Sequence, residues 1–346
     1  MTSSILFSEI HEQPGAVRRL LDMQSTPVRQ AAASLRGRFD SLLIAARGTS
    51  DNAARYAQYL FGAYNQLPVA LAAPSLFTLY QRPPRLSRML VVGISQSGQS
   101  PDIVAVITEG RRQGQPTLAI TNDPNSPLGR AAEVVIPLSA GPEKAVAATK
   151  TYTTSLAAMA LFSAALAEDA PRLAELQRIP DLMQQTLEMT AAVMGRVERY
   201  RYMDRLAVLG RGFNYATAFE VALKVKELTG VVAEPYSSAD FRHGPIAIVK
   251  NGFPVLVIAP SGEVNADMVS LVAELKKRDS EILLISDQAQ LLGQADTALA
   301  VPAGLPEWAT PLLAVLPGQC FAMQLAISKR LNPDQPIGLT KVTETY

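Results

Sequence analysis

The stretch Val91–Asp102, which reads VVGISQSGQSPD, decides the fold. The apolar run that enters it, residues 89–94, is typical of a buried parallel strand, and it breaks into a loop rich in serine. Pro101 then stands where proline favours the first turn of a helix, and residues 102–111 carry a helical pattern. The sequence therefore predicts a strand, a loop of small residues and a helix in succession.

A loop of this kind can bind an anion. Free backbone N–H groups and the positive end of the helix dipole face it, and the hydroxyls of Ser95, Ser97 and Ser100 can donate to phosphate oxygens. The alternative is a polar turn that holds no ligand. These residues alone do not decide between the two.

Further apolar runs alternate with helical patterns along the first half of the chain. We expect strands at 41–46, 68–73, 89–94, 116–121 and 134–138, and helices at 9–36, 53–60, 149–166 and 173–200. Pro27 is expected to divide the first of these helices. Strands that alternate with helices predict an α/β fold with a doubly wound parallel sheet.

The second half of the chain repeats the first. Arg47-Gly48 recurs as Arg211-Gly212, and Ser97-Gly98 recurs as Ser261-Gly262 at the same spacing. We therefore expect two tandem doubly wound, flavodoxin-like domains of αβα type. Their expected bounds are 37–170 and 201–336, with an N-terminal helical segment at 1–36, a linking helix at 171–200 and a tail at 337–346.

The two halves differ at the anion loop. The second half offers Pro260 and Glu263 where hydrogen-bond donors would be needed. A phosphate is therefore predicted to bind the first half. The second half contributes Glu220, Lys224 and Glu227, which helical spacing places on one stripe. That stripe is either a solvated face with an ordinary ion pair or part of a charged site.

Size and composition exclude several classes of protein. The chain has 346 residues, 48% of them apolar and 18% charged, which suffices for two packed domains. Its net charge of +1 argues against nucleic-acid binding as the main role. We see no apolar run of membrane-spanning length, no signal peptide and a single cysteine, Cys320, so we expect a cytoplasmic protein with no membrane partner.

Taken together, the motifs resemble those of the sugar isomerase (SIS) family, and most closely the isomerase half of glucosamine-6-phosphate synthases. The resemblance covers nearly the whole chain. The matching motifs are Glu9 to Pro14, Gly48-Thr49-Ser50, Ser95-Gln96-Ser97-Gly98, Ala140-Gly141-Pro142-Glu143, Thr149-Lys150, Glu220 through Glu227, Arg242-His243-Gly244-Pro245 and Asp334-Gln335-Pro336.

The resemblance implies a binding role for eight residues. Its phosphate-binding set is Ser50, Ser95, Gln96, Ser97 and Ser100. Its sugar-binding residues are Gly48, Thr49 and Val146, the last through its backbone.

The resemblance also implies a catalytic set. Glu227 corresponds to the base that moves a proton between C1 and C2, with Glu220 and Lys224 as its charged neighbours. His243 corresponds to the ring-opening residue, which in this family reaches the site of the other subunit of a homodimer. Lys341 corresponds to a tail lysine that closes over the sugar and forms a Schiff base with the open-chain ketose. No metal and no cofactor are implied.

This sequence departs from the synthases in ways that bear on its reaction. The synthases carry a glutaminase domain with an N-terminal cysteine nucleophile, whereas the family-like region here begins close to Met1 and Cys320 lies in an apolar helical stretch. We therefore expect that this chain does not release ammonia from glutamine. Ala148 and Arg47 replace a serine and a small residue or cysteine of the family, which leaves the exact sugar open.

The sequence thus predicts an enzyme for a sugar-phosphate substrate, an amino-sugar phosphate deaminase/isomerase. It would convert glucosamine 6-phosphate to fructose 6-phosphate and ammonia. The alternatives are another phosphosugar isomerase, a deglycase for fructosamine-type adducts, an aminotransferase-like enzyme that uses ammonia, and a sugar-phosphate sensor without catalysis.

Overall fold

A computed structural model describes residues 4–341 of the chain, and its described part divides into two compact units. The first-sheet unit comprises residues 15–143, 148–178 and 340–341. The second-sheet unit comprises residues 4–14, 144–147 and 179–339. Each unit contains one five-stranded parallel sheet.

The first sheet and its helices follow one another closely in the sequence. In chain order the elements are α2 (Gln13–Leu35), β1 (Ser41–Ala45), α3 (Gly48–Asn65), β2 (Val69–Leu71), η1 (Pro74–Leu76), β3 (Met89–Ile94), α4 (Pro101–Arg112), β4 (Thr117–Thr121), α5 (Pro127–Ala131), β5 (Val134–Pro137) and α6 (Lys150–Leu166). The five strands lie where the apolar runs predicted them.

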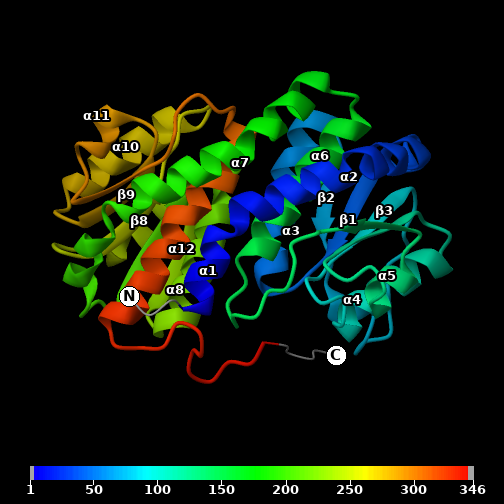
Figure 1. Ribbon diagram of the computed structural model, residues 1–346, viewed down its shortest axis with the longest axis horizontal. Coiled ribbons are helices and arrows are strands. Elements are labelled where there is room, and N and C mark those ends of the chain that lie inside the picture. Colours follow the sequence, from blue (N-terminus) through cyan, green and yellow to red (C-terminus); the bar gives the residue numbers. More distant parts are fainter. Residues whose placement is uncertain (1–3, 342–346) are drawn as a thin grey trace. The chain divides into compact units, whose positions relative to one another are not determined.

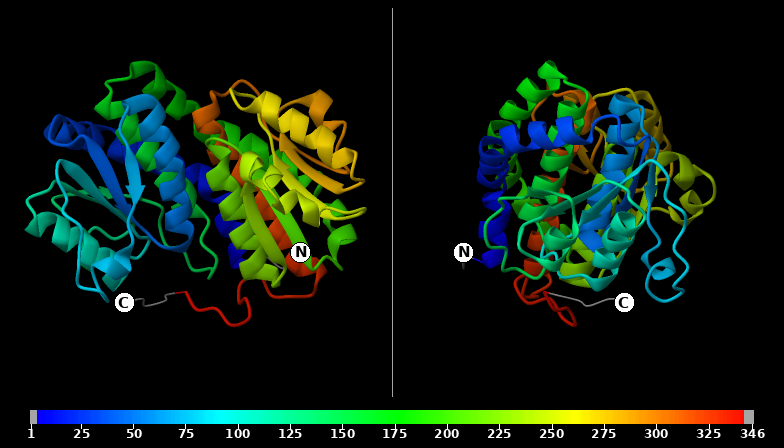
Figure 2. Two further views of the ribbon diagram at one scale, coloured as in Figure 1. Left: turned by 180° about the vertical axis from the view of Figure 1, so that it is seen from behind. Right: turned by 90° about the vertical axis from the view of Figure 1, so that its right-hand side faces the viewer.

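The remaining elements are α1 (Ile5–His11), α7 (Ala170–Ala191), η2 (Met194–Tyr200), β6 (Arg205–Gly210), α8 (Asn214–Thr229), β7 (Val232–Ser237), α9 (Ser238–Arg242), η3 (Pro245–Ile248), β8 (Pro254–Ile258), α10 (Asn265–Lys276), β9 (Glu281–Ser286), α11 (Ala289–Leu292), β10 (Thr297–Ala300), η4 (Glu307–Ala309) and α12 (Thr310–Ser328). Figures 1 and 2 show α12 beside α8 and α1, within the second-sheet unit.

The two sheets have the same topology. Their strand orders are β2-β1-β3-β4-β5 and β7-β6-β8-β9-β10, and every neighbouring pair is parallel. Each strand of the first sheet thus has a counterpart at the same place in the second. The predicted pair of doubly wound, flavodoxin-like α/β domains is confirmed.

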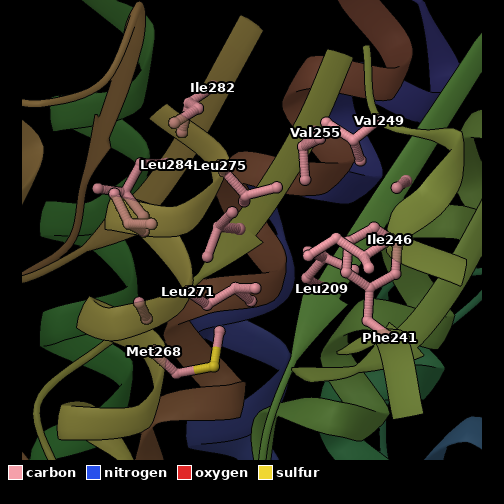
Figure 3. Packing of buried hydrophobic residues seen from close by; sticks show 14 of the residues in the cluster. Leu209, Phe241, Ile246, Val249, Val255, Met268, Leu271, Leu275, Ile282 and Leu284 are labelled. Carbon is pink, nitrogen blue, oxygen red and sulfur yellow. The ribbon is translucent and has the colours of Figure 1, made fainter. Parts of the chain in front are cut away.

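Helix α10 shows how a helix covers one of these sheets. Its buried residues Met268, Leu271, Val272 and Leu275 recur at helical spacing and form one apolar face. Figure 3 shows this face against side chains of β8 and β9, with Phe241 and Ile246 extending the same cluster. Burial of this face fixes α10 on the sheet.

Two helices differ from the sequence expectation. α2 continues through Pro27 without a break. Proline removes the N–H donor for the Met23 carbonyl, and both residues are exposed, so water can replace that donor. The helix expected to run from 173 to 200 ends at Ala191, and η2 follows as a separate 3₁₀ helix.

Helix α12 corrects the expectation that no apolar segment reaches membrane-spanning length. Together with η4 it forms a helical segment, Glu307–Ser328, that is long and apolar enough to cross a membrane by those two measures alone. Within the structure 89% of its apolar window is buried, as in the core helix of a globular domain. Cys320 lies on this helix, and burial raises the pKa of its thiol to about 12, which makes it a packed, unreactive group.

Candidate functional site: a serine loop and a buried charge cluster

The serine loop, Ser95–Ser100, lies at the topological switch point of the first sheet. β1 and β3 are neighbours, and the chain leaves them toward opposite edges of the sheet. Ala45 pairs with Gly93, so both strands end side by side. The first turns of α3 and α4 follow within a few residues. In doubly wound sheets, ligands bind at this crevice beyond the carboxyl ends of the strands.

Backbone N–H groups of the serine loop hold the hydroxyls of Ser95 and Ser97. The Oγ of Ser95 accepts a hydrogen bond from the Gly98 N–H at 3.2 Å and lies 3.4 Å from the Oγ of Ser100. The Oγ of Ser97 accepts one from the Gln99 N–H at 3.3 Å. A hydroxyl that accepts in this way can still donate its own proton, so the loop presents donors at the N-terminus of α4.

Gly98 is required by the shape of the loop. Its φ of +64° lies in the left-handed region, and a Cβ there would come within 2.0 Å of the Ser126 Oγ. The loop therefore closes tightly on the segment that starts α5.

The other predicted binding residues of this unit lie nearby in the fold. Gly48, Thr49 and Ser50 form the first turn of α3, where Ser50 is half-buried. The carbonyl of Gln96 accepts hydrogen bonds from the Asn122 N–H at 3.1 Å and the Thr121 hydroxyl at 3.3 Å, which ties the serine loop to the end of β4. The structure thus brings Ser95, Gln96, Ser97 and Ser100 into one loop, with Ser50 on the helix that follows the adjacent strand.

An ion pair spans the starts of α3 and α4. Arg47 is the residue before α3, and its Nε lies 2.8 Å from the Oδ2 of Asp102 in the first turn of α4. The Asp102 side chain is fully buried, whereas half of the Arg47 side chain is exposed. The sequence marked Arg47 as unusual, but nothing in it indicated Asp102 as the partner.

Glu143 is a candidate site residue to which the sequence assigned no role. Its buried carboxylate accepts hydrogen bonds from the N–H groups of Thr149 (2.9 Å) and Thr151 (3.2 Å) and from the Thr151 hydroxyl (2.7 Å). It also lies 3.5 Å from the Nζ of Lys341. One carboxylate thus caps the start of α6 and pairs with the predicted Schiff-base lysine.

Val146 lies on a short segment that a second buried carboxylate holds. Glu9, on α1, accepts hydrogen bonds from the Lys144 N–H at 2.5 Å and the Ala145 N–H at 3.2 Å. Glu9 and Glu143 both stand in motifs of the family, so the sequence did mark them. Their burial could not be predicted, because a single buried carboxylate produces no periodic pattern in the sequence.

The α8 charge cluster, Glu220, Lys224 and Glu227, is the chemically distinctive feature of the second-sheet unit. The Nζ of Lys224 lies 2.6 Å from Glu227 Oε2 and 3.4 Å from Glu220 Oε1. The side chains of Glu220 and Lys224 are buried, whereas that of Glu227 is 24% exposed. The alternative of a solvated helix face is therefore wrong for Glu220 and Lys224. Because burying charges is costly, their pairing is a necessity, and Glu227 is the member that meets solvent.

His243 lies on a loop at the end of α9, in the same unit as the α8 charge cluster. It is exposed, and its imidazole makes no hydrogen bond or ion pair with the described residues. Arg242 beside it is anchored to Asp267 (2.7 Å) and Glu274 (3.3 Å) on α10. The structure therefore holds the His243 loop in place without bringing His243 into the charge cluster of its own chain.

The second-sheet counterpart of the serine loop is occupied by the protein's own carboxylates. Asp287 accepts hydrogen bonds from the N–H (2.7 Å) and hydroxyl (3.0 Å) of Ser261, and Glu307 accepts one from the Glu263 N–H at 2.6 Å. Burial raises the pKa of Glu307, and so does the charge of Glu263, whereas the backbone N–H groups lower it. Three of this loop's donors are thus already used, which supports the prediction that a phosphate binds the first-sheet unit.

Fold and geometry together define a class: a duplicated doubly wound α/β protein with an anion loop in one repeat and a buried acid–lysine cluster in the other. The family model of the SIS domain matches residues 38–165 and 200–329, one match for each sheet. The chain belongs to the SIS domain family and carries two copies of the domain.

Individual relatives extend this match to nearly the whole chain. A glutamine–fructose-6-phosphate aminotransferase (isomerizing) from Pyrococcus horikoshii is 33% identical over 97% of this chain, which spans 57% of that relative's length. The C-terminal domain of glucosamine-fructose-6-phosphate aminotransferase from Francisella tularensis superposes with a TM-score of 0.88 at 28% identity, over 96% of this chain and 98% of that one. A glucosamine-6-phosphate deaminase from Thermotoga maritima shares the fold, with a TM-score of 0.81 at 21% identity over 99% and 100% of the two chains.

Proposed function

We propose that the chain is an amino-sugar phosphate deaminase/isomerase that converts glucosamine 6-phosphate and water to fructose 6-phosphate and ammonia. The observation that carries the proposal is the α8 charge cluster, in which one carboxylate reaches solvent beside a buried lysine. An aldose–ketose conversion needs such a carboxylate, because one base must remove a proton from C2 and return it to C1.

The serine loop is assigned to the substrate phosphate. The hydroxyls of Ser95, Ser97 and Ser100 and the N-terminus of α4 would donate to the phosphate oxygens, with Ser50 on α3. Binding energy from the phosphate would orient the reacting carbons, which themselves offer few distinctive groups. Gly48, Thr49 and the backbone of Val146 are assigned to the sugar hydroxyls.

Glu227 is assigned to proton transfer. In the open-chain aldose it would take the C2 proton, the C1 carbonyl oxygen would gain a proton, and an enolamine would form. Return of a proton to C1 would give the C2 imine. Lys224, whose Nζ lies 2.6 Å from the Glu227 carboxylate, holds that carboxylate in position for proton transfer. Glu220 holds the Lys224 ammonium in place from the other side.

His243 is assigned to the step before proton transfer, and Lys341 to the step after it. His243 would move a proton between the ring oxygen and C1 hydroxyl as the ring opens. The Nζ of Lys341 would attack the C2 imine, ammonia would leave, and water would hydrolyse the resulting lysine imine to the ketose. The pairing of Lys341 with the buried Glu143 supports a fixed position for this amine.

The reaction is tested by supplying glucosamine 6-phosphate without glutamine and following ammonia and fructose 6-phosphate together. Equal amounts of both would support the deaminase. Conversion of fructose 6-phosphate to glucose 6-phosphate without ammonia release would replace it by a plain isomerase. Binding of sugar phosphate without any turnover would favour a sensor.

Glu227→Gln tests the assignment of the base. We expect kcat to fall at least about 100-fold, because the amide cannot accept the C2 proton, while the Kd for fructose 6-phosphate stays within about threefold. Glu234→Gln is the matched control, since Glu234 is an exposed glutamate of the same unit, and it should leave both constants unchanged. Normal turnover in Glu227→Gln would remove Glu227 from the mechanism.

A further inference from the structure

Arg47 lies beside the serine loop, and the proposed reaction leaves it without a role. We propose that Arg47 binds the substrate phosphate directly and that the buried Asp102 orients it. The inference deepens the proposed function and rests on its assignment of the serine loop to phosphate. It makes Arg47 a determinant of specificity for phosphorylated sugars and Asp102 a positioning residue.

The strand register places Arg47 at the carboxyl end of the sheet, the end at which the serine loop lies. Ala45 pairs with Gly93 at the ends of β1 and β3. Arg47 and Ser95 each lie two residues beyond these partners, so both stand at the same end of the switch point. The ion pair with Asp102 then fixes the guanidinium against the first turn of α4, the turn whose N-terminus the serine loop faces.

The ion pair leaves most of the guanidinium's donor capacity unused by Asp102. Its hydrogen bond to Asp102 runs through Nε, which carries one of the five N–H donors of the group. Half of the Arg47 side chain is exposed, so solvent and ligands can reach it. A planar guanidinium offers paired donors that match two oxygens of a phosphate, and it stays charged at any physiological pH.

The charge of the buried Asp102 carboxylate affects how a phosphate can bind here. An ionised Asp102 at the start of α4 would by itself repel a phosphate dianion bound at the same helix end. Arg47 neutralises that charge and still has donors for the ligand. Asp102 in turn restricts a long side chain to one position, which lowers the entropy lost when the phosphate binds.

A double-mutant comparison separates direct contact from simple neutralisation. We would measure the Kd of fructose 6-phosphate by calorimetry for the wild type, Arg47→Ala, Asp102→Asn and the double variant, with the melting temperature of each as a check on folding. Arg47→Ala should raise the Kd about 10- to 100-fold, as expected for loss of charge-assisted hydrogen bonds. Loss of Arg47 should raise the Kd by a similar factor in the Asp102→Asn background, where no carboxylate remains to be neutralised.

Arg88→Ala is the matched control. Arg88 forms an exposed ion pair with Asp40 in the same unit, at the start of β3 rather than at its end, so its loss makes the same change in charge. Its Kd should equal that of the wild type. Unphosphorylated fructose should bind the wild type and Arg47→Ala equally weakly.

Each result bears on the proposal in a defined way. If the double variant binds as tightly as Asp102→Asn, Arg47 only neutralises Asp102 and the inference is wrong. An unchanged Kd in Arg47→Ala would also overturn it. A wild type that binds no fructose 6-phosphate would overturn the phosphate site and the inference together. A wild type that binds it but releases no ammonia would overturn only the deaminase, and the Kd values would still decide the role of Arg47.

Discussion

At the scale of the single residue, Glu143 combines two tasks in one carboxylate. It caps the start of α6 through two backbone N–H groups and pairs with Lys341 at 3.5 Å. The cap keeps the carboxylate rigid, and a rigid carboxylate can hold the amine at the end of a long, flexible side chain. We therefore regard Glu143 as a positioning residue for the proposed Schiff base.

Glu143→Gln should lower the yield of the lysine imine. The amide oxygen can still accept a backbone hydrogen bond, but the charge that attracts Lys341 is lost. With fructose 6-phosphate present, borohydride should trap less adduct at Lys341, by about threefold to tenfold, as measured by mass spectrometry. Glu133→Gln, which breaks an exposed pair with Arg38 in the same unit, should trap as much as the wild type. Equal trapping in Glu143→Gln would show that Lys341 needs no such partner.

At the scale of the element, the sequence predicted those helices and strands whose bounds depend on the hydrophobic pattern. The five strands of the first sheet and α6 lie within a residue or two of their predicted bounds, because a buried strand or helix needs an uninterrupted apolar run. Pattern did not predict the course of α2 through Pro27, since that depends on whether the freed carbonyl meets water. Nor did it predict the burial of Glu220 and Lys224, because a paired charge and a solvated one have the same spacing.

The tight closure of the serine loop gives a prediction for Gly98→Ala. Two costs add: the left-handed φ of +64°, and a Cβ within 2.0 Å of the Ser126 Oγ. Gly114 has a similar φ of +71° but open space around its Cβ position, so Gly114→Ala isolates the first cost. We expect losses of about 1 kcal/mol for Gly114→Ala and about 2–4 kcal/mol for Gly98→Ala in urea unfolding.

Ligand binding distinguishes the two glycine variants further. Gly98→Ala should also weaken binding of fructose 6-phosphate, because the shifted loop misplaces its hydroxyls, whereas Gly114→Ala should bind normally. Equal stability losses in the two variants would mean that the loop adjusts around the new methyl group.

The Glu307 carboxylate, in the second-sheet counterpart of the serine loop, gives a prediction for how stability depends on pH. Because folding raises the pKa of Glu307, chiefly by burial, the folded state holds the Glu307 proton more tightly than the unfolded chain. Its contribution to stability is therefore fully present below the unfolded pKa of about 4.5 and is lost as the pH rises through the folded value. Glu307→Gln cannot ionise, so its free energy of unfolding relative to the wild type should increase from pH 4.5 to pH 7.

Urea unfolding of both proteins at several pH values measures this difference. Glu281→Gln, in the same unit, is the comparison for a glutamate that takes no part in the loop. A difference between Glu307→Gln and the wild type that shrinks as the pH rises would contradict the assigned direction. Glu307 is partly exposed, and solvent screening will keep the change small.

At the scale of the whole molecule, the duplicated fold accounts for the division of roles that we propose. Both repeats have a loop at the same switch point, but one loop carries the hydroxyls of Ser95 and Ser100 in contact with each other, whereas in the other Asp287 and Glu307 accept hydrogen bonds from the backbone. A repeat that satisfies its own loop is free to carry other chemistry. In this chain the second repeat holds the α8 charge cluster, and the proposed reaction assigns phosphate binding and proton transfer to different copies of one fold.

Two copies of the chain are expected to share the proposed active site. The His243 imidazole is exposed and has no partner among the described residues, and the family resemblance implies that it serves the site of a second subunit in a homodimer. His243→Ala and Lys341→Ala should each lose most activity alone. If His243 acts across the interface, a mixed dimer contains one site with both residues intact, and mixing the two variants under conditions of subunit exchange should restore up to about a quarter of wild-type activity. Exchange is verified with differently tagged chains, because a lack of recovery is informative only if the subunits have exchanged. Full exchange without any recovery would place His243 in the site of its own chain, and a protein that stays monomeric at assay concentrations would rule out a shared site altogether.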